Sequence, residues 1–225
     1  MSFVSNLKIA GMLPFKVSMK ELVEFLTENG VNHSDFGKGR YKTIEKLLQE
    51  VNSRETILKT KFLLTRKDSN EQEVPLVKKV VMSFSFLNFD VFYCHEGLNL
   101  HLYEEKQVFT DGRERSRKDS LGCSLAEKFS FKESIVDGIM RGIREELQLH
   151  ISESQTEFVK ERSGVLHELP SHNYPDMLLW NCVYYGYNLY LQKYQFNKDG
   201  YQEFQEDKTT YFKWETVEEW EQRKK

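Results

Sequence analysis

The sequence predicts a mixed α/β (α+β) fold, in which a mixed central sheet lies between helices and a small helical extension precedes it. Two observations predict this arrangement. Up to about residue 55 the apolar residues recur at helical spacing, and from Ile57 onward they give way to runs of β-branched and aromatic residues. One strong amphipathic helix, roughly Ser134 to Leu147, then follows several strands and precedes others, as expected for an α/β/α sandwich.

The N-terminal region predicts two short helices. Ser18 is a good N-cap for a helix in which Leu22 and Leu26 recur at helical spacing, and Gly30 is a plausible stop. A second amphipathic helix is expected over 44–51. We therefore expect two parts: a helical extension over 1–55 and the main domain over 56–225.

The rest of the chain is mostly β in character. Leu98, Leu100 and Leu102 alternate with polar residues, which is typical of a half-buried strand, and Asp111-Gly112 is a hairpin-turn pair. Strands are predicted over 57–65, 74–95, 98–102, 158–166, 178–191 and 209–214, with a final helix over 217–223.

Composition excludes several classes of protein. A net charge of −3 over 225 residues gives no bulk attraction to nucleic acid or an anionic membrane, so RNA binding is not indicated. Three cysteines, an odd number without zinc spacing, argue against a disulfide scaffold or a structural zinc site. The first residues lack the apolar core of a signal peptide, and the longest apolar stretch, Val80 to Cys94, is too short and too polar to span a bilayer. We expect a cytoplasmic protein with no membrane segment.

One helix carries the chemical signal. Its apolar stripe consists of Ile135, Val136, Ile139, Met140, Ile143 and Leu147. Glu146 lies about 20° from Ile135 on the helical wheel, inside the edge of that stripe. A carboxylate there is costly unless it is paired, hydrogen-bonded or bound to a metal. Gly138 and Gly142 leave room beside it, so a hard cation such as Mg²⁺ or Mn²⁺ suits this face, while pairing of Glu146 with a basic residue is the plainer alternative.

The same segment resembles the Nudix box. That pattern runs Gly, five residues, Glu, seven residues, Arg-Glu, an aliphatic, any residue, Glu-Glu, any residue, Gly and an aliphatic. The matching residues here are Glu133, Arg141, Ile143, Glu145, Glu146 and Leu149. Three positions depart from the pattern: the first glycine is Glu127, the glutamate after the arginine is Gly142, and the closing glycine is Gln148.

The resemblance implies a Nudix-like fold and a hydrolase that cleaves the diphosphate linkage of a nucleoside diphosphate joined to another moiety X. It implies Mg²⁺ or Mn²⁺ as cofactor, with Glu145 and Glu146 as metal ligands and Glu133 and Arg141 as a structural ion pair of the catalytic helix. Further carboxylates from outside the motif are sought among Glu127, Glu203 and Glu206. Basic residues near the motif, the candidates for binding a nucleotide-type substrate, are Arg113, Arg115 and Lys128.

Gly142 leaves a second interpretation open. Losing one oxygen ligand weakens a Mg²⁺ site without necessarily abolishing it, because water and substrate phosphates complete its shell. The alternative is a Nudix-fold protein that has lost catalysis and binds a nucleotide, an RNA or a protein partner. Restoring a carboxylate with Gly142→Glu is expected to strengthen metal binding if the helix face lacks only that ligand.

Overall fold

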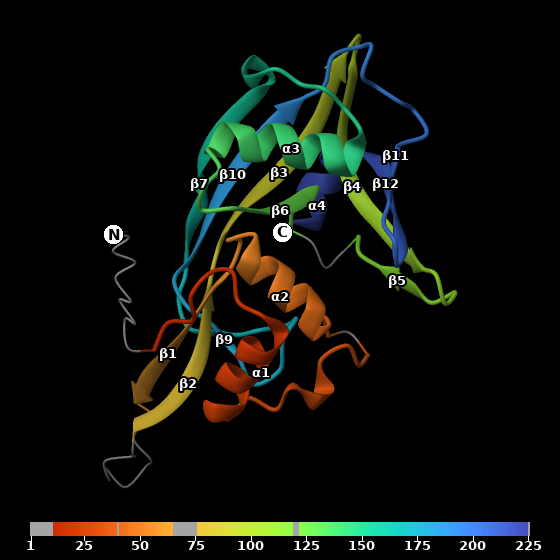
Figure 1. Cartoon of the computed structure of the whole chain (residues 1–225). Helices are drawn as coiled ribbons and strands as arrows, with labels where there is room; N and C mark the ends of the chain where they lie inside the picture. The colour runs from red at the N-terminus through yellow and green to blue at the C-terminus, as the bar shows by residue number, and fades with distance from the viewer. Residues whose placement is uncertain (1–10, 40, 65–75, 119–121, 225) are drawn as a thin grey trace, which may run out of the picture. The chain divides into compact units, whose positions relative to one another are not determined.

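The computed structural model describes residues 11–39, 41–64, 76–118 and 122–224, and it confirms a mixed α+β chain (Figure 1). The chain forms two compact units. The first unit comprises the residues up to Ser85, 130–132 and Val165–Val183; the second comprises Phe86–Phe129, Glu133–Gly164 and Tyr184–Lys225. The expected boundary at residue 55 stays a prediction. The first unit continues past that residue through the next two strands, to Ser85.

The first unit combines short helices with a small mixed sheet. Its elements are α1 (Met19–Glu28), the 3-10 helix η1 (His33–Asp35), α2 (Ile44–Asn52), β1 (Ile57–Leu64), β2 (Leu76–Ser83), β8 (Leu169–Pro170) and β9 (Leu178–Leu179). The strand order is β1-β2-β9-β8, with β1 antiparallel and β9 parallel to β2. Ser18 caps α1 as predicted, and Leu22, Leu26 and Leu47 are fully buried in this unit's core.

The second unit is built on a larger sheet. Its elements are β3 (Ser85–His95), β4 (Leu98–Phe109), β5 (Glu114–Ser116), β6 (Leu125–Phe129), α3 (Ile135–Leu147), the 3-10 helix η2 (Glu153–Gln155), β7 (Thr156–Leu166), β10 (Cys182–Tyr190), β11 (Tyr201–Phe204), β12 (Lys208–Thr216) and α4 (Val217–Arg223). The strand order is β11-β12-β4-β3-β10-β7; β5 also pairs with β4, and β6 with β3. The sequence did not predict β6 or β11, and both prove important for the site.

Helices α3 and α4 cover opposite faces of this sheet (Figure 1). Leu102 of β4 belongs to the buried cluster that includes Ile139 and Ile143 of α3. The preceding residue, His101, stacks on Trp220 of α4 with ring centroids 4.5 Å apart. Because successive side chains of a strand point to opposite faces, the second unit is the helix–sheet–helix sandwich that the sequence predicts.

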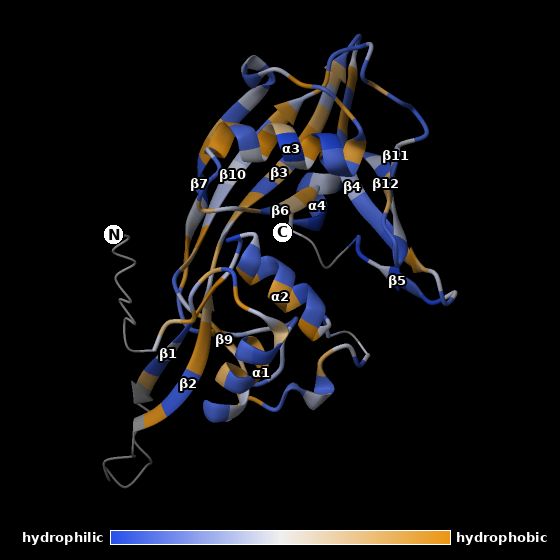
Figure 2. Cartoon of the chain, in the orientation of Figure 1, coloured by the Kyte–Doolittle hydropathy of each residue, from blue (hydrophilic) through white to orange (hydrophobic). Residues whose placement is uncertain are grey.

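Helix α3 turns a narrower apolar face to the sheet than its sequence suggests. Ser134 caps the helix by accepting a hydrogen bond from the Asp137 amide, and Gln148 ends it in the left-handed conformation at φ 58°. Figure 2 shows hydrophobic residues of α3 and of the strands it covers. Ile139 is buried, whereas Val136 is 37% exposed. Placing Val136 within the apolar stripe was therefore wrong, because its side chain lies outside the buried face of the helix.

Buried charges join α4 to the sheet. His101 lies between two buried carboxylates: its Nδ1 is 3.1 Å from Glu215 Oε1 and its Nε2 is 3.0 Å from Asp90 Oδ1. Arg223 forms an ion pair with Glu215, and Lys224 Nζ lies 3.3 Å from Asp90 Oδ2. Each buried acid therefore has cationic partners at the C-terminal end of the chain, as buried charges require.

Two expectations from composition bear on the described residues. No helix in this part of the chain is long and apolar enough to cross a membrane. Cys94, Cys123 and Cys182 are all free thiols. The N-terminal segment examined for a signal peptide lies largely outside the described residues, and the cytoplasmic location stays a prediction.

The burial of α3 gives a first testable prediction. Ile139→Ala should lower the free energy of unfolding by about 2–5 kcal/mol, because it leaves a cavity between helix and sheet. Val136→Ala on the same helix is the control, and it should change stability by no more than about 0.5 kcal/mol. Urea unfolding of both variants checks this. Equal losses would show that α3 buries a different face.

Candidate carboxylate site on helix α3

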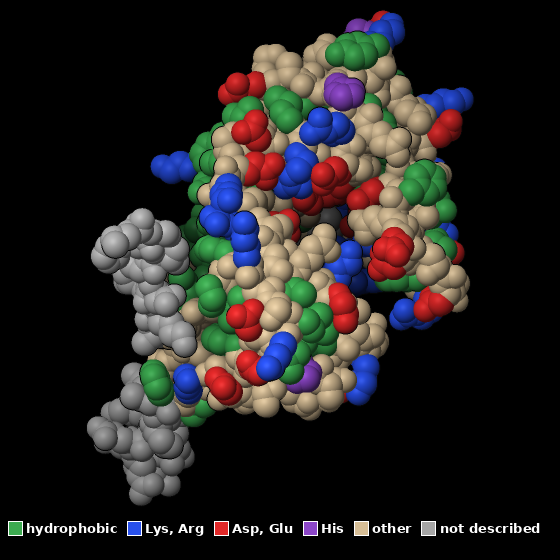
Figure 3. Space-filling view, in the orientation of Figure 1, with side chains coloured by type: hydrophobic (Ala, Val, Ile, Leu, Met, Phe, Trp, Pro, Cys, Tyr) green, Lys and Arg blue, Asp and Glu red, His purple; other side chains and the backbone are tan. Residues whose placement is uncertain are grey.

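The candidate site lies where α3 meets β6. Glu133 stands just before the N-cap of α3, and Arg141 and Glu145 follow one turn apart on the helix. Helical residues four positions apart are neighbours on the surface, so these two side chains meet. Acidic and basic side chains gather over α3 in Figure 3.

Arg141 is the centre of the site, because all five of its N–H donors have partners. Its Nε and Nη2 donate to the two carboxylate oxygens of Glu133 at 2.9 and 3.1 Å. Its Nη1 donates to Glu127 at 2.5 Å and to Glu145 at 3.0 Å. The fifth donor reaches the backbone carbonyl of Lys128 at 2.9 Å. A guanidinium has five donors in a fixed planar fork, so this arrangement fixes helix and strand together.

Glu127 reaches Arg141 by crossing over Gly142. A Cβ at position 142 would lie 3.0 Å from Cγ and 3.2 Å from Cβ of Glu127, closer than ordinary van der Waals contact. The space into which a side chain at 142 would grow is therefore filled from β6. The expectation that Gly142→Glu simply adds a ligand overlooks this contact, because strand β6 is not visible in the sequence pattern.

Glu146 is the carboxylate that Arg141 does not neutralise. Its side chain is half-buried, and neither of its oxygens forms a hydrogen bond or ion pair with any described residue. Burial, followed by the like charges of Glu127, Glu203 and Glu104, raises the pKa of Glu146 well above its ordinary value. Glu145, the other predicted metal ligand, is 55% exposed and bound to Arg141.

Glu127, Glu146 and Glu203 form an acidic surface with a fourth member, Glu104, which the sequence analysis did not predict. It is 6% exposed, and Arg117 Nε lies 3.3 Å from each of its carboxylate oxygens. Its Oε1 is buried without a hydrogen bond. The signal was present, because Glu104 continues the alternation of Leu100 and Leu102 and therefore places a carboxylate in a buried register.

The basic candidates lie in different surroundings. Arg113 is in the β4–β5 turn, where its Nε donates to Asp111 at 2.7 Å and its guanidinium covers the ring of Phe109. Arg115 is exposed on β5, paired in register with Gln107 of β4. Lys128 alone is part of the strand that meets α3, and its backbone carbonyl bonds to Arg141.

Glu203 and Glu206, the carboxylates sought outside the motif, also lie in different surroundings. Glu203 of β11 is half-buried, and its charge acts on Glu146, whereas Glu206 is exposed in the loop after that strand. In the part of the chain that the structure describes, no three His, Cys, Asp or Glu side chains stand close enough together to hold a metal ion. The donor chemistry nevertheless fits one: the oxygens of Glu146 and the buried Oε1 of Glu104 lack hydrogen bonds, and hard divalent cations take such oxygen ligands.

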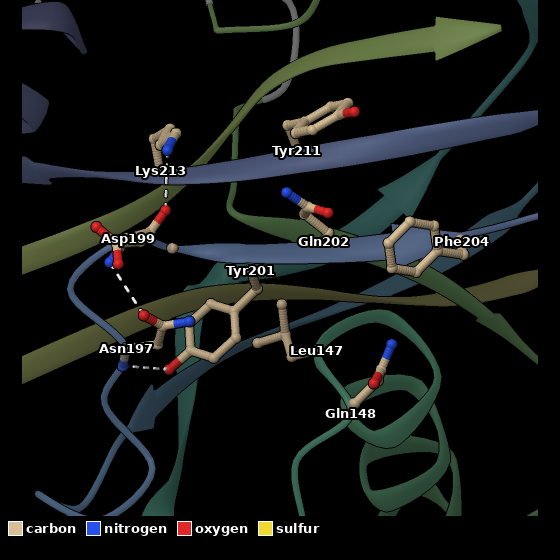
Figure 4. Close-up of a pocket in the computed structure, with 10 residues that line it drawn as sticks. Leu147, Gln148, Asn197, Asp199, Tyr201, Gln202, Phe204, Tyr211 and Lys213 are labelled. Atoms are coloured by element: carbon tan, nitrogen blue, oxygen red, sulfur yellow. Dashed lines mark hydrogen bonds between the residues drawn. The ribbon is translucent and has the colours of Figure 1, made fainter.

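A cavity of about 300 Å³ opens at the C-terminal end of α3 (Figure 4). Leu147 and Gln148 face Tyr201 and Phe204 of β11 across it, with Tyr211 and Lys213 of β12 beyond. Tyr201 donates its hydroxyl to the carbonyl of Gln195 at 2.6 Å, which fixes one wall. The cavity therefore places aromatic surface one turn beyond the carboxylates.

Comparison with known proteins gives structural likenesses only. No family model and no curated protein matches the sequence. Two crystal structures of the C. elegans Ap4A hydrolase, one a binary complex, are 14% identical to this chain, with TM-scores of 0.32 and 0.33; the alignments cover 61% and 60% of this chain and 83% and 81% of theirs. Deinococcus radiodurans DR0079 is 13% identical with a TM-score of 0.29, over 70% of this chain and 83% of its own.

The raised pKa of Glu146 predicts a pH-dependent cost to stability. At a pH below its ordinary value of about 4.5 the carboxyl is neutral in both the folded and the unfolded chain, so Glu146→Gln should then change little. As the pH rises, the unfolded chain ionises first, and wild type should become less stable than Glu146→Gln. Urea unfolding at about pH 4 and about pH 8 measures the difference. An unchanged difference would mean that Glu146 is already paired in the folded protein.

The saturation of Arg141 predicts that lysine cannot replace it. Arg141→Lys keeps the charge but loses the planar fork, and should lower the free energy of unfolding by about 1–3 kcal/mol. Arg144→Lys, on the exposed side of the same helix, is the matched control and should be nearly neutral. Thermal and urea unfolding compare the two. Equal effects would show that the bonds of Arg141 add nothing to stability.

Proposed function

We propose that this protein is a Nudix-type hydrolase, which uses Mg²⁺ or Mn²⁺ to cleave the diphosphate linkage of a nucleoside diphosphate joined to another moiety. One observation carries the proposal. Glu133, just before the N-cap of α3, and Arg141 on the helix, at the spacing of the Nudix box, form a two-bond ion pair, with Glu145 and Glu146 one turn beyond Arg141. Such a pair holds the helix in a fixed orientation and so positions the two carboxylates that follow it.

Glu146 is the first candidate to bind the cation. Arg141 already neutralises Glu133 and lowers the negative charge around Glu145, whereas Glu146 forms no ion pair with a described residue, and Lys208 is the cation whose charge acts on it. Glu104 offers a second oxygen, its buried Oε1. When bound, the cation would neutralise the diphosphate and activate the attacking water. The carboxylates of this chain would hold it and direct it to the substrate.

The substrate would approach the surface shared by α3 and β6. A diphosphate cannot bind beside several carboxylates without added positive charge, which the cation and a basic side chain supply together. Of the predicted basic residues, Lys128 is the one that belongs to β6, and its backbone carbonyl accepts from Arg141. Arg113 and Arg115 remain predicted contacts further out, at the β4–β5 hairpin.

A Mn²⁺ titration followed by water-proton relaxation tests the proposal. Wild type should bind Mn²⁺, and Glu146→Gln should weaken binding at least about tenfold, because it removes the unpaired carboxylate. Glu105→Gln is the control: Glu105 is the neighbour of Glu104 on β4, but its charge raises the pKa of Tyr103 and Lys106 and is not among the main charges that act on Glu146.

Hydrolysis completes the test. Wild type with Mg²⁺ should release product from at least one member of a panel of nucleoside diphosphate sugars, dinucleoside polyphosphates, dinucleotides and coenzyme A, and Glu146→Gln should not. Nucleotide binding without turnover would favour the catalytically inactive alternative. Absence of Mn²⁺ binding, or equal binding by wild type and Glu146→Gln, would contradict the proposed site.

A further inference from the structure

Two departures from the Nudix pattern are reciprocal. The chain has a glutamate at 127, where the pattern has glycine, and a glycine at 142, where the pattern has glutamate. These positions are 15 residues apart in sequence, on β6 and α3, yet Cγ of Glu127 lies only 3.0 Å from where a Cβ of residue 142 would be. The two exchanged residues thus occupy one place in the structure.

The contact explains why position 142 is glycine. Glycine is among the least favourable residues in a helix interior, so it needs a reason that the helix itself does not supply. Gly142 is buried, and a Cβ at this position would press on the base of the Glu127 side chain, so β6 would have to shift by a few tenths of an ångström. Glycine at 142 therefore lets Glu127 cross over the helix without a shift of either element.

Packing alone does not explain the carboxylate of Glu127. A small apolar side chain would fill the space above a glycine equally well. Glu127 instead becomes the third acid on Arg141, after Glu133 and Glu145, so three carboxylates share one guanidinium. Glu146 lies on the same face and forms no ion pair with a described residue. A site evolved for stability alone would avoid this excess of negative charge.

We propose that Glu127 supplies, from strand β6, the cation-binding carboxylate that the Nudix pattern places at position 142. Glu127 and Glu146 then act together, and water and the substrate's phosphates would complete the shell of the cation. The 2.5 Å bond from Arg141 Nη1 fixes the direction of the Glu127 carboxylate. The inference rests on the proposed function and adds to it a residue that the Nudix pattern does not contain: one carboxylate ligand has moved from the helix to the strand.

The decisive variant is Glu127→Gln, which keeps the size of the side chain and an oxygen that can accept from Arg141 but removes the charge. By water-proton relaxation, Glu127→Gln should bind Mn²⁺ about tenfold more weakly than wild type. Its thermal unfolding should remain close to that of wild type, because the contact over Gly142 is kept. Glu105→Gln again serves as the control for the loss of one negative charge.

The exchange itself can be reversed. Gly142→Glu alone should lower the unfolding temperature, because its side chain meets Glu127. Glu127→Gly alone should lose Mn²⁺ affinity about as much as Glu127→Gln. The double variant Glu127→Gly/Gly142→Glu restores the order of the Nudix pattern and should bind Mn²⁺ to within about threefold of wild type. Such recovery is a coupling between the two positions that independent sites do not show.

The outcomes separate this inference from the proposed function. Wild-type Mn²⁺ binding that is lost in Glu146→Gln but kept in Glu127→Gln would overturn the inference alone, and Glu127 would then be a structural partner of Arg141. Binding that Glu146→Gln leaves intact would overturn the proposed function as well. If the double variant does not fold, the titration of Glu127→Gln still decides the question.

Discussion

The guanidinium of Arg141 is the interaction on which the site depends. One side chain joins the residue before α3, the body of α3 and strand β6 through five hydrogen bonds, four of them to carboxylate oxygens. A lysine has no planar fork and could not make these bonds at fixed angles. Because Glu133, Glu127 and Glu145 are all bound to this group, their directions are set before any ligand arrives. Glu146 is the carboxylate of this group that Arg141 does not bind. Carboxylates held in place by hydrogen bonds and a carboxylate without such bonds therefore lie close together on one helix.

The same arrangement explains why the site is costly. Glu104 is buried, Glu146 is half-buried, and the negative charges around Glu146 oppose its ionisation. A fold selected only for stability would replace such groups with apolar residues of similar size. Titratable groups that are strongly perturbed by burial and by each other are typical of functional sites. The unfavourable energy of gathering these carboxylates is thus consistent with a bound cation, whose positive charge would reverse the sign of the local electrostatic field.

Local periodicity made much of this arrangement visible in the sequence. The 3.6-residue repeat and the Ser134 cap identify α3, and the eight-residue spacing of Glu133 and Arg141 brings them within reach across two turns. The contact of Glu127 with Gly142 was not predictable, because it depends on β6 pairing with β3, which no local pattern reveals. Glu104 lay between these cases. Its buried register could be read from strand alternation, but its neighbours across the sheet could not.

The buried charges beneath α4 affect how the protein can be produced and handled. Arg223 and Lys224, near the C-terminal end of the chain, supply cations to Glu215 and Asp90 in the interior of the sandwich. Removing these two residues would therefore unbalance buried acids rather than change the surface alone. An affinity tag placed next to them needs a spacer that leaves both side chains free to turn inward. Preparations that differ by two residues could then differ in melting behaviour while showing the same band on a gel.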